Sequence, residues 1–193
     1  MKRLAIALVH YPILARDQSI VTTAITNLDI HDIARSAFTF GVERYYIVHP
    51  VAAQRELASR VKEHWTNGSG AKRIPDRRPP MECLQIVESL EAAARDWGTC
   101  HGSPEPAETW VTSAQPLPGA KTHEQSAHDL RTGESPVLLV FGTGWGLAPA
   151  VTTTATRSLA PIVSPRADGY NHLSVRAAAA ILLDRLLGSG DGA

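Results

Sequence analysis

The sequence is poor in cysteine and carries no net charge. Its two cysteines, Cys83 and Cys100, form no CxxC pair and no metal-site spacing, which argues against a disulfide framework and favours a reducing compartment. With 19 basic and 19 acidic residues, the formal net charge is zero, so no global attraction to nucleic acid or to an acidic membrane is expected. A local basic patch would still be sufficient for binding RNA.

Long hydrophobic runs are also absent, and none approaches the length of a transmembrane helix. The opening apolar stretch, residues 3–9, stops at His10 and Pro12 without a small-residue cleavage site, so it predicts a buried strand rather than a signal peptide. We therefore expect a cytoplasmic protein with no membrane partner. Hydrophobic residues make up 44% of the 193, which suits a single domain. We expect that domain to cover residues 1–188, followed by a flexible tail at 189–193.

Hydrophobic periodicity divides the chain into alternating strands and helices. Strands are predicted at residues 3–9, 44–50, 109–112 and 135–142, with a shorter one within 157–163. Helices are predicted at residues 28–42, 51–65, 83–97, 121–132 and 171–188, with Thr26 or Asn27 as the N-cap of the first and a mobile Pro/Arg-rich loop at 71–80. This alternation indicates an α/β fold with a mostly parallel sheet, in which ligands bind at the carboxyl ends of strands.

The segment "LLVFGTGWGL", Leu138–Leu147, places a glycine-rich loop directly after the clearest strand. It lacks the G-x-G-x-x-G spacing and early position of a dinucleotide-binding loop, and no P-loop motif occurs in the chain. Two interpretations stay open from the residues alone. The glycines allow a ligand to approach the backbone closely, or they form a tight turn with no ligand.

Three segments together resemble the three motifs of SPOUT-type (α/β-knot) RNA methyltransferases, and nearly the whole chain is consistent with that resemblance. They are "NLDIHDIARSAFTFGVERYYIV", the late glycine loop, and "LAPIVSPRADGYNHLSVRAAAAILLDRL". With "LVHYP", they look like a bacterial subgroup of that superfamily. The resemblance implies a single-domain α/β-knot fold with a mostly parallel sheet and a C-terminal trefoil knot, which is rare among protein folds.

The resemblance also implies the chemistry. The expected function is S-adenosylmethionine-dependent methyl transfer to RNA (tRNA or rRNA), at a base nitrogen or a ribose 2′-hydroxyl. S-adenosylmethionine is the expected cofactor, no metal is expected, and a homodimer is expected because knotted enzymes commonly build the active site across two chains. The alternative is a non-catalytic SPOUT-fold protein that binds RNA or a partner. A nucleotide-using oxidoreductase is a more distant third.

The expected cofactor site combines the glycine loop with the final loop and the start of the last helix. Its predicted residues are Phe141, Gly142, Thr143, Gly144, Trp145, Gly146, Leu147, Ile162, His172, Leu173 and Ser174. The glycines would let backbone groups reach the cofactor, and the apolar side chains would form its walls. Trp145 is equally compatible with an exposed or interface aromatic, and Ser174 with the N-cap of the last helix.

The predicted catalytic residues are Arg35, Asp29 and Asp168. Arg35 matches the arginine of the first SPOUT motif, and Asp29 matches the asparagine often found six residues before it; an arginine can hold an RNA phosphate or lower the pKa of a hydroxyl. A surface arginine paired with Asp32 at i, i+3 is the alternative. Because Thr143 and Gly144 stand where many relatives carry a glutamate, Asp168 is the candidate replacement base, or else a turn residue before Gly169.

Two further side-chain groups offer candidate ligands for a metal ion and candidate contacts for RNA. Asp29, His31 and Asp32 offer metal ligands, but His31 points away from the helix face shared by the two aspartates, so no metal site is predicted. RNA contacts are predicted for basic residues of the Pro-rich loop and the preceding helix, which would hold phosphates; a solvated, salt-bridged surface is the alternative. These residues are Lys72, Arg73, Arg77, Arg78, Arg55, Arg60 and Lys62.

Overall fold

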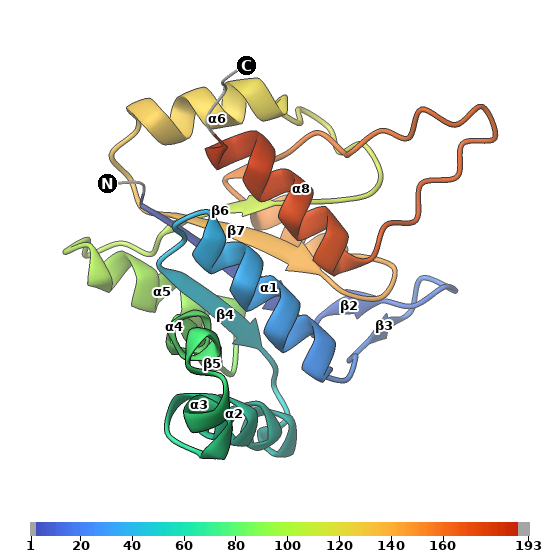
Figure 1. Cartoon of the computed structure of the whole chain (residues 1–193). Coiled ribbons are helices and arrows are strands. Elements are labelled where there is room, and N and C mark those ends of the chain that lie inside the picture. The colour runs from blue at the N-terminus through green and yellow to red at the C-terminus, as the bar shows by residue number, and fades with distance from the viewer. Residues whose placement is uncertain (1–2, 189–193) are drawn as a thin grey trace.

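The computed structural model describes residues 3–188 and contains a six-stranded parallel sheet with helices on both faces (Figure 1). The strand order is β5-β4-β1-β7-β6-β8, with every neighbouring pair parallel. The strands are β1 Leu4–Val9, β4 Arg44–Val48, β5 Leu84–Val87, β6 Glu108–Val111, β7 Val137–Gly142 and β8 Arg157–Ser158. The mostly parallel α/β architecture predicted from the sequence is confirmed.

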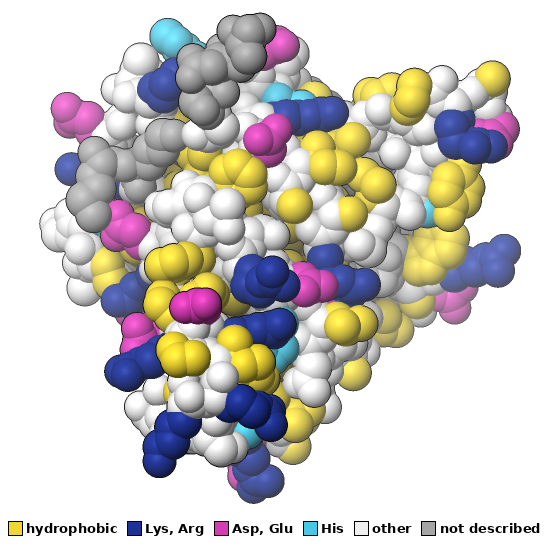
Figure 2. Space-filling model, in the orientation of Figure 1, with side chains coloured by type: hydrophobic (Ala, Val, Ile, Leu, Met, Phe, Trp, Pro, Cys, Tyr) yellow, Lys and Arg dark blue, Asp and Glu magenta, His cyan; other side chains and the backbone are white. Residues whose placement is uncertain are grey.

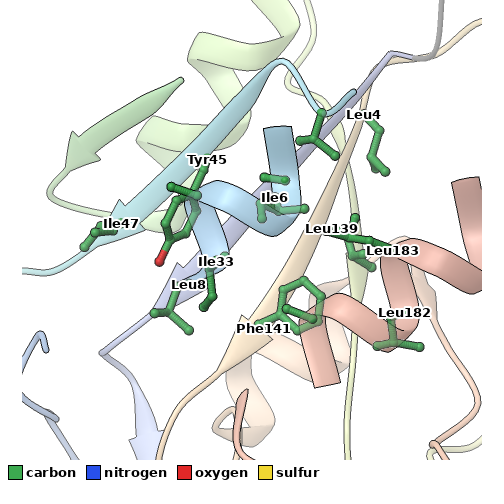
Figure 3. Packing of buried hydrophobic residues seen from close by; sticks show 14 of the residues in the cluster. Leu4, Ile6, Leu8, Ile33, Tyr45, Ile47, Leu139, Phe141, Leu182 and Leu183 are labelled. Atoms are coloured by element: carbon green, nitrogen blue, oxygen red, sulfur yellow. The ribbon is translucent and has the colours of Figure 1, made fainter. Parts of the chain in front are cut away.

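The central strand β1 alternates between two hydrophobic layers. Leu4, Ile6 and Leu8 belong to the larger cluster, which α1 (Asn27–Thr39) and α8 (Val175–Leu187) also line. Figure 3 shows these leucine and isoleucine side chains meeting Leu139 and Phe141 of β7 and Leu182 and Leu183 of α8. The smaller residues of β1, with Ala5 and Ala7 among them, face a second cluster lined by α5 (Leu90–Cys100) and α7 (Pro149–Thr154).

The remaining elements surround this frame. The helices α2 (Ala52–Thr66), α3 (Ser69–Arg73), η1 (Pro75–Arg77) and α4 (Arg78–Glu82) lead to β5, and α6 (His123–Thr132) precedes β7. A small antiparallel hairpin, β2 (Ile13–Leu14) with β3 (Ile20–Val21), follows β1. Thr26 caps α1 by accepting a hydrogen bond from the Asp29 amide, as predicted.

Two predicted elements are wrong, and two were missed. The expected helix at 83–97 is a strand followed by a helix, because "LQIV" pairs with β4 and Ser89 then caps a new helix. A stretch of four residues, three of them apolar, cannot be told from a helical turn by periodicity alone. The expected loop at 71–80 contains the ends of α3 and α4 with η1 between them. The hairpin and α7 were not predicted, and the predicted tail at 189–193 lies outside the described residues.

Core packing predicts a clear contrast between two leucines. Leu139 in β7 is fully buried, whereas Leu57 on α2 keeps 47% of its surface exposed. Leu139→Ala removes packed methylene groups and leaves a cavity, so we expect it to lower the free energy of unfolding by about 3 kcal/mol. Urea denaturation measures this loss. Leu57→Ala is the control, with an expected change below about 1 kcal/mol, and equal losses in the two variants would contradict the described burial.

Candidate functional site

Three polar side chains follow the three central strands at the same level. The register pairs Val9 of β1 with Val48 of β4 and with Gly142 of β7, so the next residues, His10, His49 and Thr143, lie together at the carboxyl edge. His10 and His49 are buried, with ring centroids 5.5 Å apart. Carboxyl edges of parallel sheets are where α/β proteins bind ligands.

A hydrogen-bond chain joins His10 to the glycine loop through Thr23. His10 Nδ1 lies 3.0 Å from the Thr23 hydroxyl, which contacts the Thr143 hydroxyl, and Thr143 Oγ1 lies 3.2 Å from the Val9 carbonyl oxygen. One arrangement gives every proton of this chain an acceptor. Thr143 donates to Val9, Thr23 donates to Thr143, and His10 Nδ1–H donates to Thr23. His10 Nε2, which is buried and has no hydrogen-bond partner in the described structure, then carries a lone pair rather than a proton.

Both histidines are held neutral. Burial, with a smaller contribution from the neighbouring His49, lowers the pKa of His10 from 6.5 to about 4. Burial also lowers the pKa of His49. Its Nε2–H donates to the Thr23 carbonyl at 3.0 Å while its Nδ1 accepts from the Val51 amide at 3.1 Å, so a second proton would face an N–H group.

The glycine loop contacts the hairpin through its backbone. The Trp145 amide donates to the Leu14 carbonyl at 3.0 Å, and the Leu14 amide donates to the Gly146 carbonyl at 2.9 Å. Gly144 has φ +55°, and a Cβ there would lie 2.9 Å from Ile13 Cγ2. The close approach at Gly144 is therefore to the hairpin of the same chain, while the Trp145 side chain stays 57% exposed.

An ion pair between a half-buried arginine and a buried aspartate ties the first turn of α8 to the first turn of α1. Arg176 Nη1 lies 2.7 Å from Asp29 Oδ1, and the Asp29 side chain is only 8% exposed. Asp29 also accepts from the Thr26 hydroxyl at 2.7 Å, and Arg176 Nε lies 3.6 Å from Asp32. This pair holds the start of α8 beside the start of α1. The N-cap of α1, Thr26, is three residues after Thr23, which contacts His10 at the carboxyl edge.

The site thus places a glycine loop, the start of α8 and a polar cluster around the ends of adjacent parallel strands. The sequence profile of SAM-dependent RNA methyltransferases matches residues 3–188. The chain belongs to this family. The predicted resemblance is confirmed, and SAM is the cofactor on which the family depends.

Relatives and solved structures agree with that membership. A protein named tRNA (guanine-N(1)-)-methyltransferase from Nitratidesulfovibrio vulgaris is 42% identical over 187 residues, covering 97% of this chain and 42% of that protein. The chain therefore spans less than half the length of that relative. The fold is similar to TrmJ from Z. mobilis, with a TM-score of 0.61 at 18% identity, covering 98% of this chain and 71% of that one. It is also similar to the SpoU methyltransferase AviRb from Streptomyces viridochromogenes in complex with AdoMet. The TM-score is 0.55 at 13% identity, and the match covers 95% of this chain and 56% of AviRb.

The three predicted catalytic residues of this family member lie in different surroundings. Asp29 is enclosed by the ion pair with Arg176, whereas Arg35 is exposed and lines a shallow hollow of about 330 Å³ on α1 with Asp32 and Ser36. Within residues 3–188, Asp32 pairs with Arg176 and not with Arg35, so the i, i+3 alternative is not observed. Asp168 is exposed and bonded to Arg166, whose guanidinium holds the pKa of that carboxyl below its usual value and weakens it as a base.

The predicted cofactor residues form a loop group and a helix-start group. Phe141 and Leu147 are buried and Ile162 packs half-buried against the core, while Trp145, His172 and Leu173 are exposed. Ser174 accepts a hydrogen bond from the Ala177 amide and is the N-cap of α8, the alternative left open by the sequence. The segment between β8 and α8 projects from the body in Figure 1, and the Asn171 side chain donates to the Ile162 carbonyl at 2.7 Å near its base.

Four site residues were missed by sequence reasoning: His10, Thr23, His49 and Arg176. His10 and His49 each follow the last apolar residue of a predicted strand, a signal that could have identified them. Thr23 and Arg176 gave no local signal, because their partners are distant in the chain.

No group of three or more His, Cys, Asp or Glu side chains in residues 3–188 could hold a metal ion. Within the same range, every helix is too short or too polar to cross a membrane.

The neutral His10 predicts acid-sensitive folding. Its pKa is depressed in the folded state, so protonation favours the unfolded chain, and the stabilisation present above pH 6.5 falls as the pH drops toward 4. Between pH 7.5 and 5, His10 alone should lower the free energy of unfolding by about 2 kcal/mol. Urea denaturation across this range measures the loss. His10→Gln should reduce it, and the exposed control His128→Gln should leave it unchanged; an unchanged loss in His10→Gln would refute the assignment.

The ion pair between α1 and α8 predicts strong coupling. Arg176→Met leaves Asp29 buried with only Thr26 as a side-chain partner, so we expect a loss of about 3 kcal/mol in the free energy of unfolding. Asp29→Asn should remove much of that penalty in the double variant, giving a coupling energy above about 1 kcal/mol. Thermal and urea unfolding test the cycle. Arg185→Met, an exposed position on the same helix, is the control, and additive losses would contradict the coupling.

Proposed function

We propose that this chain transfers a methyl group from S-adenosylmethionine to RNA at the carboxyl edge formed by the ends of β1 and β7. The observation that carries the proposal is the position of the glycine loop, which joins the end of β7 to the hairpin beside the polar cluster of His10 and Thr143 in a chain matched by the family over residues 3–188. The family depends on SAM, and the AviRb neighbour of similar fold binds AdoMet.

In this proposal the cofactor lies against the glycine loop and the start of α8. The exposed side chains of Trp145 and Leu173 form its apolar walls, and backbone groups near Gly146 bind its polar ends. The ion pair of the buried Asp29 with Arg176 positions α8, so Asp29 acts as a positioning residue rather than as a proton acceptor. Arg35, exposed on α1, binds a phosphate of the RNA.

The methyl group of the sulfonium donor is already activated, so the protein's task is to align donor and nucleophile and to accept a proton. The nucleophile is a base nitrogen or a ribose 2′-hydroxyl of tRNA or rRNA. The tRNA class is the one named for the Nitratidesulfovibrio relative, and more than half of that protein lies outside the matched region. The guanine-N1 position in its name therefore does not transfer to this chain.

We further propose that residues 1–188 act as one domain in the cytoplasm, that the C-terminal segment forms a trefoil knot, and that two chains form a homodimer. Exposed apolar side chains around the proposed site support the dimer, since a partner chain would cover them. They are Tyr11, Leu28, Trp145, Val163, Tyr170 and Leu173. A partner would also complete a site whose final loop projects from the body of a single chain.

A non-catalytic RNA-binding role is the second candidate. It is favoured by the lack of an obvious base, because Thr143 faces inward to Val9 and Thr23 while Asp168 is paired with Arg166. This candidate predicts SAM binding with no label transferred from radioactive SAM to unmodified tRNA or rRNA transcripts. Label transfer would exclude it.

Calorimetric titration with S-adenosylmethionine and S-adenosylhomocysteine tests the cofactor site. Both should bind saturably while NAD does not, and Trp145→Ala should weaken binding about tenfold by removing an apolar wall. Leu57→Ala, a similarly exposed apolar residue on α2, is the control. Gly144→Val is a poor choice, since its side chain would clash with Ile13 whether or not a cofactor binds. Selective binding of NAD would overturn the proposal.

A further inference from the structure

Four side chains from three helices form one contiguous cluster away from the proposed cofactor site. The ring of Trp65 on α2 makes edge contacts with His31 of α1 and with His64, each at a centroid distance of 5.2 Å. The guanidinium carbon of Arg77 lies 5.4 Å from the centre of the Trp65 ring. We call His31, His64, Trp65 and Arg77 the tryptophan cluster. It holds an arginine in place beside α1.

Three further cations lie on α1 and on α3, which packs against the α2 and η1 helices of the tryptophan cluster. Arg35 follows His31 by one helical turn, and Lys72 and Arg73 lie in the last turn of α3. All three are exposed, and within residues 3–188 their side chains make no ion pair or hydrogen bond. Figure 2 shows basic side chains and histidines gathered over the face that carries α1 and the α2–α4 segment. In a chain of zero net charge, this is a local concentration of positive charge.

The other basic residues of this region already have partners in the same chain. Arg55 donates to the carbonyl oxygens of His49 and Pro50, at 2.9 and 2.6 Å, and Lys62 donates to the carbonyl of Leu84. Arg60 pairs with Glu56, and Arg78 pairs with Glu82. Four of the seven predicted RNA-contact residues thus have hydrogen-bond or ion-pair partners in the chain. The side chains of the other three, Lys72, Arg73 and Arg77, make no hydrogen bond or ion pair within the described residues 3–188.

The chemistry of this face suits a chain of phosphates. An arginine held against an aromatic ring loses little freedom on binding, and its planar fork matches phosphate oxygens. Several unpaired cations along one face match a repeating anion better than a single carboxylate. The helix α1 connects this face to the proposed site, since Asp29 in its first turn contacts α8 while His31 and Arg35 follow on the same helix.

We propose that the tryptophan cluster, with Arg35, Lys72 and Arg73, is the surface on which the phosphate backbone of the RNA substrate docks, leading along α1 to the carboxyl edge. The inference rests on the proposed function, because it assumes that the partner is RNA. It assigns a defined face to that partner and excludes the neighbouring Arg55, Arg60, Lys62 and Arg78 from the main contacts.

Fluorescence anisotropy with labelled, unfractionated bacterial tRNA and the full chain tests the surface. Arg73→Gln/Arg77→Gln should weaken binding about tenfold at low salt and reduce the slope of log affinity against log salt by about 1 to 2. The matched control is Arg95→Gln/Arg131→Gln, which removes two exposed arginines from α5 and α6 and should change affinity less than about twofold. Lys72→Gln/Arg73→Gln leaves the tryptophan cluster intact and should also weaken binding. It replaces the first variant in the test if Arg77→Gln prevents folding.

The possible outcomes separate this inference from the proposed function. Salt-dependent tRNA binding by the wild-type chain with equal losses in test and control variants would overturn the docking surface while leaving the proposed function standing. No binding of labelled tRNA or of labelled rRNA transcripts by the wild-type chain at any salt concentration would overturn both. Calorimetry with S-adenosylmethionine should give the same affinity for all these variants, and a parallel loss of cofactor binding would show that the substitutions act on the fold rather than on RNA docking.

Discussion

The position of β1 between β4 and β7 is the constraint on which the rest of the structure depends. Parallel pairing on both sides aligns Val9 with Val48 and with Gly142, so segments more than 130 residues apart end at the same level. The register alone brings His10, His49 and Thr143 together. The hydrogen bonds through Thr23 then connect the end of β1 to the glycine loop, and burial keeps both histidines neutral.

The glycine loop packs against its own chain on one side and is exposed on the other. Its backbone pairs with Leu14, and Gly144 needs both its positive φ and its missing Cβ because the hairpin packs against it. The loop is thus held rigidly by its own chain, while Trp145 on its outer side stays exposed. A preorganised loop of this kind loses little freedom when a ligand binds. The ion pair of Asp29 with Arg176 performs the same task for α8, whose first turn it fixes near that edge.

Much of the frame could be predicted from the sequence, whereas the polar contacts of the site could not. The strand before Gly142 and the helices around Ile33 and Leu183 carry strong local periodicity, so their type was predicted correctly. The strand at Leu84–Val87 was not, since four residues with a glutamine among them are too few to define a period. Arg176 and Thr23 acquire their roles only through partners distant in the chain, and the exposed state of Arg35 beside the enclosed Asp29 depends on how α8 packs against α1.

The central claim is that S-adenosylmethionine binds where the glycine loop, the final loop and the start of α8 meet the ends of β1 and β7. Hydrogen–deuterium exchange with and without S-adenosylhomocysteine, the demethylated cofactor, tests this most directly, because it reports each segment separately without any substitution. The account predicts slower exchange in residues 142–147 and 160–176 on ligand binding, with little change in α2 and α5. Protection confined to other segments, under conditions in which the ligand is bound, would contradict it.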